Sequence, residues 1–433
     1  MKNVYIIFLF IFIVISIFSN CSALFKFGRR KCAPYRTVSL LNYFELLGAI
    51  KNRQNPQESL VVPILPRAKL KLSTLEEIKS KGYNASTHII LSKDGYYTTV
   101  DRISGGILSP PRKGKQAVLL FHGLGGIGSN WIIQPGSRNL AFLLADAGYE
   151  VWLANGRGSS RSMKHTHLNA NRDISYWSFS FEEMGTEDLP LIADLILQKT
   201  GTNQIYYVCH SLGCGLFLAG LSEKPELNKK FKASFLLAPG AYFGSGYGPV
   251  ANLGLLVAGT PLEDILNRIF MGRFRAQPEY IQSPAVLYAI FGVDSYQLNQ
   301  TNFRNALEKG FDNSVARSFF HGGQNIKSCS FRRYDHGRRG NLKKYGKTEP
   351  QTYNLDGMTV PTYIFYGESD NLLTPWDVKR TRDAIPSKYM RGFYRVEWSQ
   401  FNHLDFITAN DADVLVYNRI LNIMTKLDLE NTH

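Results

Sequence analysis

Residues 207–215, Tyr-Val-Cys-His-Ser-Leu-Gly-Cys-Gly, decide the fold of this 433-residue chain. An apolar β run turns here directly into a glycine-rich helix start, with Ser211 at the turn. Such a turn, a nucleophile elbow, raises the serine hydroxyl above a sheet and strains the serine backbone, so the residues two before and two after it must be small. Gly213 meets this need, whereas Cys209 stands where glycine is usual. The alternative is an ordinary strand, loop and helix containing a serine, and the motif alone does not exclude it.

Short apolar runs alternate with helical patterns on both sides of this motif. Fully apolar strands between helices indicate a mostly parallel sheet covered on both faces, which is an α/β fold. A β-hairpin with an Asp-Gly turn is expected before this sheet, at 88–91 and 96–103, preceded by a short helix that Ser73 caps. The strands predicted for the sheet are 117–121, 150–154, 205–209, 233–238, 362–366 and 393–398, and the helices are 138–147, 182–199 and 411–427.

The alternation is lost between residues 239 and 358, where glycine, proline, aromatic and basic residues replace it. Because a structureless insertion of this length is improbable in a compact domain, we expect a mainly helical cap over the loops of the sheet. The domain organisation predicted from these observations is a signal peptide at 1–23, an N-terminal extension at 24–72, the first part of the core at 73–238, the cap or lid insertion at 239–358 and the second part of the core at 359–433.

The N-terminus has the pattern of a secretory signal peptide. Lys2 precedes an apolar run at 4–18, and Cys-Ser-Ala at 21–23 suits cleavage after Ala23. An uncleaved anchor is the alternative, but the run is shorter than the roughly 20 residues of a spanning helix. We therefore expect a secreted or lysosomal protein without a transmembrane segment in the mature chain. Glycosylation sequons at Asn84 and Asn299 give this location weak support.

Cleavage of the leader leaves four cysteines: Cys32, Cys209, Cys214 and Cys329. Cys209 and Cys214 lie within the elbow motif, and we expect them to be buried thiols. Cys32 and Cys329 then form the only attractive disulfide pair.

The net charge is +15, which becomes +14 when Lys2 is lost with the leader (15 − 1). A basic surface favours acidic partners. The leader and the absence of a recognisable binding motif argue against nucleic acid, so anionic lipid surfaces or released fatty acids are the more natural partners. The densest basic stretch is 332–347, for which a solvated loop is the simpler explanation.

An elbow serine needs an oxyanion hole, formed by the backbone N–H of the next residue and by a second N–H from an early loop after a strand. Leu212 supplies the first N–H group. The second is assigned to Leu124 in the stretch Phe-His-Gly-Leu-Gly-Gly at 121–126, which follows an apolar strand. A simple turn or a phosphate-binding loop is the alternative, but the stretch lacks the Lys and Ser/Thr of a P-loop.

The acid and base of a serine triad should follow the serine in the order acid, histidine, each after a late strand. Asp370 follows the strand at 362–366 and is the acid chosen, with Glu368 as the nearby alternative. His403 follows the last predicted strand and is the base that would act on Ser211. The rival histidines are His122, His165, His167, His210, His321 and His336. His165, His167 and Cys209 lack convincing metal-ligand spacing, and no cofactor is expected.

These and other stretches together resemble the acid lipase family, which includes the gastric and lysosomal acid lipases, over residues about 73 to 427. The matching stretches are 121–124 with 129–131, 151–158 with 164–165, 176–184, 188–190, 353–355 and 402–406. The resemblance implies the α/β-hydrolase fold with a cap and mobile lid, and hydrolysis of triacylglycerols, cholesteryl esters or related lipid esters at an interface. It carries the nucleophile, acid and base over to Ser211, Asp370 and His403.

The chain departs from the family pattern in places. Cys209 and Leu212 stand where the family usually has glycine and glutamine, and the cap disulfide of mammalian members has no evident counterpart, since Cys329 stands alone in that region. Two other functions are weighed beside the lipase. One is a lipid-binding carrier that keeps the fold without turnover, and the other is an esterase for non-lipid esters.

Overall fold

The computed structural model of the chain describes residues 73–134, 136, 138–244, 249–274, 290–292, 296–297 and 300–430. The predicted signal peptide, the N-terminal extension with Cys32, and the sequon at Asn299 lie outside the described residues. Within the described residues, no helix is long and apolar enough to cross a membrane.

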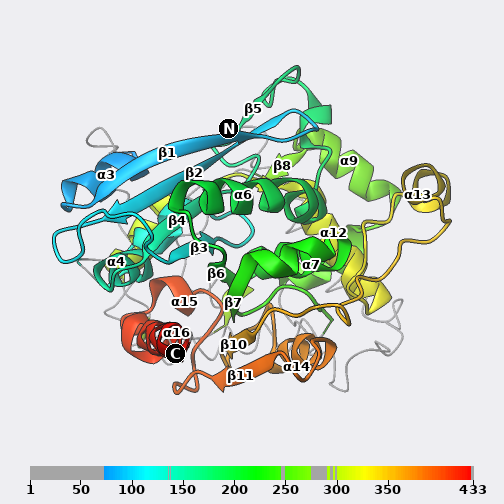
Figure 1. Cartoon of the computed structure of the whole chain (residues 1–433). Helices are drawn as coiled ribbons and strands as arrows, with labels where there is room; N and C mark the ends of the chain where they lie inside the picture. The colour runs from blue at the N-terminus through cyan, green and yellow to red at the C-terminus, as the bar shows by residue number, and fades with distance from the viewer. Residues whose placement is uncertain are drawn as a thin grey trace, which may run out of the picture. The chain divides into compact units, whose positions relative to one another are not determined.

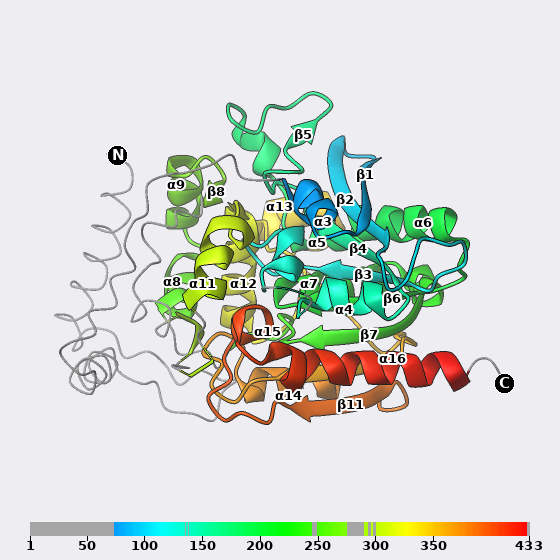
Figure 2. The same ribbon diagram turned by 90° about the vertical axis from the view of Figure 1, so that its left-hand side faces the viewer.

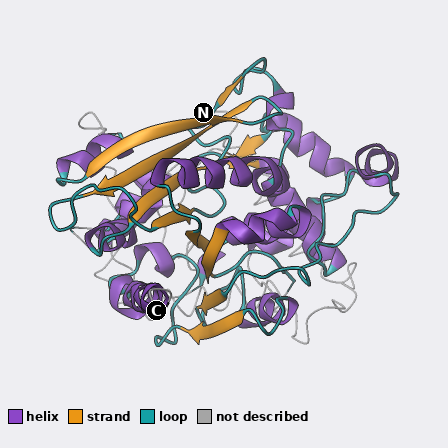
Figure 3. Cartoon of the chain, in the orientation of Figure 1, coloured by secondary structure: helices purple, strands orange, loops and turns teal. Residues whose placement is uncertain are grey.

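A nine-stranded sheet forms the centre of the fold (Figures 1 and 3). Its order is β1-β2-β4-β3-β6-β7-β10-β11, with β5 paired to β2. The strands are β1 (Asn84–Leu91), β2 (Tyr96–Gly105), β3 (Ala117–Phe121), β4 (Glu150–Asn155), β5 (Lys164–His165), β6 (Ile205–His210), β7 (Phe231–Leu237), β10 (Thr362–Tyr366) and β11 (Met390–Arg395). β1, β2 and β4 pair antiparallel, and every pair from β4 to β11 is parallel. The predicted hairpin and mostly parallel sheet are therefore confirmed.

Helices cover both faces of this sheet (Figure 2). α4 and α16 lie on one face, and α6 and α7 lie on the other. The core helices are α3 (Thr74–Ser80), α4 (Leu140–Asp146), α5 (Phe181–Glu183), α6 (Leu189–Thr200), α7 (Leu212–Glu223), α14 (Pro375–Ala384), α15 (Asp405–Thr408) and α16 (Asn418–Glu430). Ser73 caps α3 as predicted, because its hydroxyl accepts from the N–H of Glu76 while the Glu76 carboxylate accepts from the N–H of Ser73.

In the described residues between β7 and β10, most of the regular structure is helical, as predicted. It contains α8 (Pro249–Val257), α9 (Pro261–Ile269), β8 (Arg273–Phe274), α11 (Gln300–Asn305), β9 (Ser314–Val315), α12 (Ala316–Ser328) and α13 (Gly337–Tyr345). β8 and β9 form a short antiparallel pair, and α12 packs against α8.

The helical stretch predicted at 182–199 is confirmed, because α5, a π-helical turn at Met184–Asp188 and α6 follow one another without a break, with Pro190 directly after the π-helical turn. Other predicted boundaries differ from the structure. The helix predicted at 411–427 begins with a π-helical turn, Asp413–Tyr417, and ends later. The last strand lies three residues earlier than predicted, because β11 is a partly exposed edge strand without a clear apolar pattern.

Candidate active site

Ser211 lies in the turn that joins β6 to α7, with φ 54° and ψ −121°. Positive φ is unfavourable for a side chain with a Cβ atom, so other contacts must hold this backbone. The N–H of Ser211 donates to the carbonyl of Leu237 (2.9 Å), and its carbonyl accepts from the N–H groups of Cys214 (3.0 Å) and Gly240 (2.9 Å). A Cβ atom on Gly213 would lie 2.6 Å from the carbonyl oxygen of His122, so this position requires glycine. The strained turn has the form expected of a nucleophile elbow.

The structure brings Ser211, His403 and Asp370 together. The Ser211 hydroxyl donates to Nε2 of His403 (2.9 Å), and Nδ1–H of His403 donates to Oδ2 of Asp370 (2.7 Å). Oδ1 of Asp370 accepts from the backbone N–H groups of Leu372 and Leu373 (both 2.9 Å). His403 and Asp370 are each only 3% exposed. This is the order of contacts that a Ser-His-Asp triad requires.

The alternative residues do not reach this arrangement. Glu368 is about half exposed and forms an ion pair with Arg395 (3.0 Å) at the surface. His321 bonds to the carbonyl of Arg332, and Nε2 of His165 donates to the carbonyl of Asp94. In the described part of the chain, no three His, Cys, Asp or Glu side chains are placed to hold a metal ion.

His210 has a role that the sequence did not indicate. Its Nε2–H donates to the backbone carbonyl of His403 (2.9 Å), and the two rings lie 4.7 Å apart. Burial lowers the pKa of His210 well below its usual value, so the ring is neutral and keeps this bond in mildly acidic solution. The elbow is thereby joined to the loop that carries His403. Only the position of His210 beside Ser211 could have suggested this contact.

The glycine-rich stretch after β3 forms one wall of a pocket. Leu124 and Leu212 both line this pocket, together with Gly123 and Gly125. Leu212 is the first residue of α7, so its N–H has no acceptor within the helix. Both residues assigned to the oxyanion hole therefore lie at one pocket.

The His122 side chain forms two hydrogen bonds that fix the glycine-rich stretch after β3. Its Nδ1–H donates to the carbonyl of Gly123 (2.8 Å), and its Nε2 accepts from the N–H of Gly156 (3.0 Å). Burial lowers the pKa of His122 to about 4, so the ring is neutral and can donate and accept at the same time. The loop is thereby tied to the end of β4.

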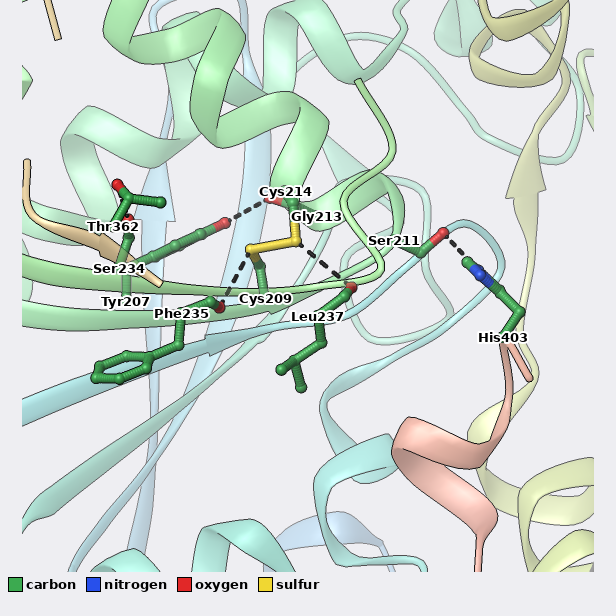
Figure 4. Close-up of a disulfide and its surroundings, with 10 residues drawn as sticks. All are labelled: Tyr207, Cys209, Ser211, Gly213, Cys214, Ser234, Phe235, Leu237, Thr362 and His403. Atoms are coloured by element: carbon green, nitrogen blue, oxygen red, sulfur yellow. Dashed lines mark hydrogen bonds between the residues drawn. A yellow bond between two sulfur atoms is a disulfide. The ribbon is translucent and has the colours of Figure 1, made fainter. Parts of the chain in front are cut away.

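The prediction that Cys209 and Cys214 are thiols is wrong, because they form a disulfide (Figure 4). The elbow folds the end of β6 back on the first turn of α7 and brings the two Cα atoms to 5.2 Å, within the range in which disulfides form. Cys329 is also disulfide-bonded. Its expected partner, Cys32, lies outside the described residues, so that pairing stays a prediction.

A serine at a strained elbow, a histidine and a buried aspartate on a mostly parallel sheet define the class of serine hydrolases with an α/β-hydrolase fold. Comparison with known protein families gives the same class. The family described as alpha/beta hydrolase fold matches residues 116–408, and the partial alpha/beta-hydrolase lipase region matches residues 74–135.

Individual relatives narrow the class further. Lipase member M of Homo sapiens is 32% identical over 83% of this chain and 86% of its own length. Gastric triacylglycerol lipase of Bos taurus is 33% identical over 83% of this chain and 92% of its own length. Lysosomal acid lipase/cholesteryl ester hydrolase of Homo sapiens is 31% identical over 82% of this chain and 91% of its own length. The chain therefore belongs to the acid lipase family of α/β-hydrolases. It is a lipase, a serine ester hydrolase, and the resemblance noted in its sequence is confirmed.

Proposed function

We propose that this lipase hydrolyses the ester bonds of triacylglycerols and cholesteryl esters through an acyl-serine intermediate on Ser211. The observation that carries the proposal is the continuous chain of hydrogen bonds from the Ser211 hydroxyl through His403 to Asp370. The relatives named above supply the substrate class, since two of them are named for triacylglycerol and cholesteryl ester hydrolysis.

In the first half-reaction, Nε2 of His403 takes the proton of Ser211 as the serine oxygen attacks the ester carbonyl. The oxyanion forms at the pocket beside Leu124 and Leu212, whose backbone N–H groups we assign to stabilise it. His403 then gives the proton to the departing alcohol. Water enters in the second half-reaction and releases the fatty acid by the same steps in reverse order.

Asp370 acts through His403. Its carboxylate accepts from Nδ1–H, which places the proton on Nδ1 and leaves Nε2 free to accept from the serine. The negative charge also stabilises the imidazolium that forms during attack. The two backbone N–H donors on Oδ1 keep the carboxylate from turning away.

We assign residues 239–358 as a cap that shapes the acyl pocket, between core segments 73–238 and 359–433. Asn313 and Val315 from this insertion line the same pocket as Phe121 and Leu216 of the core. The N–H of Asp312 donates to the carbonyl of Gly125 (2.7 Å), so the insertion is bonded directly to the proposed oxyanion loop.

We further propose that the protein is secreted or lysosomal and meets its substrate at a lipid–water interface, without nucleic acid as a partner. Relatives include gastric and lysosomal lipases. Asn84 is exposed at the start of β1, which leaves its side chain accessible for glycosylation.

The test is hydrolysis of emulsified long-chain triacylglycerol and cholesteryl oleate by the purified chain, with Ser211→Ala as the inactive variant. Ser80→Ala makes the same change on the exposed surface of α3 and serves as the matched control. We expect activity in the wild type and in Ser80→Ala, and none above background in Ser211→Ala. Activity on short soluble esters alone would favour the esterase alternative, and lipid binding without turnover on any ester would favour the carrier.

A further inference from the structure

The disulfide between Cys209 and Cys214 encloses the turn that carries Ser211. Cys209 is the second-last residue of β6, two positions before Ser211, and Cys214 is the third residue of α7, three positions after it. Both side chains are fully buried. The covalent ring therefore contains the proposed nucleophile and joins the strand that precedes it to the helix that follows it.

The bond also resolves a steric conflict. An elbow brings the residue two before the serine against the first turn of the helix, and glycine normally relieves the crowding. Two unbonded sulfur atoms need about 3.5–4 Å between them, whereas bonded sulfurs lie about 2.0 Å apart. Cys209 is therefore tolerated at this position because it is bonded to Cys214.

The surroundings give the ring little room to move. Sγ of Cys209 lies 3.7 Å from the carbonyl oxygen of Phe235, and Sγ of Cys214 lies 3.8 Å from that of Leu237, both on β7 (Figure 4). On the helix, the hydroxyl of Tyr207 donates to the carbonyl of Gly213 (2.8 Å). The same carbonyl of Leu237 accepts the N–H of Ser211, so one backbone oxygen of β7 contacts both the disulfide and the serine.

The contacts that hold the positive φ of Ser211 are otherwise hydrogen bonds of the backbone. Each can lengthen when the cap or a substrate shifts the elbow, and a small displacement of a reacting atom lowers the rate of reaction strongly. A covalent link between the two flanks cannot lengthen in this way. It restricts the directions in which the Ser211 hydroxyl can leave the line to Nε2 of His403.

From this arrangement we propose that the Cys209–Cys214 disulfide is a positioning element of the active site, which holds the Ser211 hydroxyl in line with His403. The proposal rests on the proposed role of Ser211 as the nucleophile. It assigns the two cysteines an effect on the chemical step, in addition to the stability that any disulfide contributes.

The test uses variants of the full chain that remove the link in different ways. Cys209→Ala/Cys214→Ala removes both sulfurs. Cys209→Gly/Cys214→Ala also restores the small residue that an elbow ordinarily has, so the crowding is relieved and the cross-link is what is lost. Cys329→Ala is the matched control, since it removes a disulfide-bonded cysteine from the end of α12.

The readouts are kcat and KM on a short soluble ester and the rate constant of inactivation by an organophosphonate, all measured well below the melting temperature of each variant. We expect kcat and the inactivation rate of both double variants to fall by about ten-fold or more, with KM little changed. Cys329→Ala should keep the wild-type kcat.

A purely stabilising disulfide gives a different result. Both double variants would then have lower melting temperatures but wild-type kcat and wild-type inactivation rates, and this result would overturn the proposal. Should Cys209→Ala/Cys214→Ala fail to fold, the glycine-containing variant decides the question. A wild-type chain that is inert on the ester and towards the phosphonate would instead refute the proposed function, so the two failures are distinguishable.

Discussion

Replacing Asp370 by asparagine tests the triad with almost no change in shape. Oδ1 of Asp370 accepts two backbone N–H groups, from Leu372 and Leu373, while Oδ2 accepts Nδ1–H of His403. An asparagine must place its carbonyl oxygen at the Oδ1 position, because an NH₂ group there would face two donors. Its NH₂ group then points at His403.

This orientation has a defined chemical consequence. The amide would donate to Nδ1 of His403, which forces the ring proton onto Nε2, the atom that faces the Ser211 hydroxyl. The imidazole can then no longer accept the serine proton. In a serine protease, this change of tautomer lowers kcat about 10⁴-fold, or about 5.4 kcal/mol in the barrier. We expect an effect of the same order for Asp370→Asn.

The assay is kcat and KM on a soluble ester, with the melting temperature measured alongside. Because the number of hydrogen bonds is conserved, we expect a melting temperature and a KM close to those of the wild type. Glu368→Gln is the matched control, since it makes the same change on an exposed carboxylate two residues away and should keep full activity. An Asp370→Asn enzyme that keeps more than about a tenth of the wild-type kcat would refute the reasoning, because a wrong tautomer cannot sustain that rate.

Three further outcomes are expected. Gly213→Ala should lower stability by about 1–3 kcal/mol and reduce kcat, because its Cβ would press on the carbonyl oxygen of His122; wild-type urea unfolding and activity would contradict this. Arg157→Met should lower the free energy of unfolding by about 3–5 kcal/mol, since Asp188 is buried and loses its 2.6 Å ion pair; a loss under about 1 kcal/mol would count against it. Burial lowers the pKa of His122 and His321 to about 4, so the unfolded chain takes up protons first as the pH drops. The stability that these two histidines contribute should therefore be fully present above pH 6.5 and fall toward pH 4, by up to about 1.4 kcal/mol per pH unit for each, and urea titrations of His321→Gln should show a shallower fall than wild type.

Much of the fold was predictable because the central strands are apolar on both faces. β3 and β10 begin and end where the sequence predicted, and both are almost wholly buried. β11 was placed three residues too late because an exposed edge strand needs no continuous apolar run. The predicted helix around Pro190 is confirmed, but the π-helical turn at Met184–Asp188 just before this proline has no local sequence pattern.

The order of the candidate site followed from chain topology, since the acid and base of this fold come after late strands. Its supporting contacts did not follow. Sequence spacing cannot show that Cys209 and Cys214 are close enough to bond, because their approach depends on the sharpness of the turn at Ser211. The contact from His210 to the carbonyl of His403 joins residues 193 positions apart and has no local pattern.

The insertion leaves the sheet after β7 and returns to it at β10, the strand that pairs with β7. The two strands are parallel, and the hydroxyls of Ser234 in β7 and Thr362 at the start of β10 are hydrogen-bonded (2.8 Å), so the sheet holds the strands on either side of the insertion side by side. The entropy of closing a loop grows only slowly with its length, by about 0.6 kcal/mol for each doubling. Evolution can therefore lengthen, shorten or replace this whole segment at little thermodynamic penalty, and substrate preference can diverge between relatives while the sheet beneath keeps one geometry.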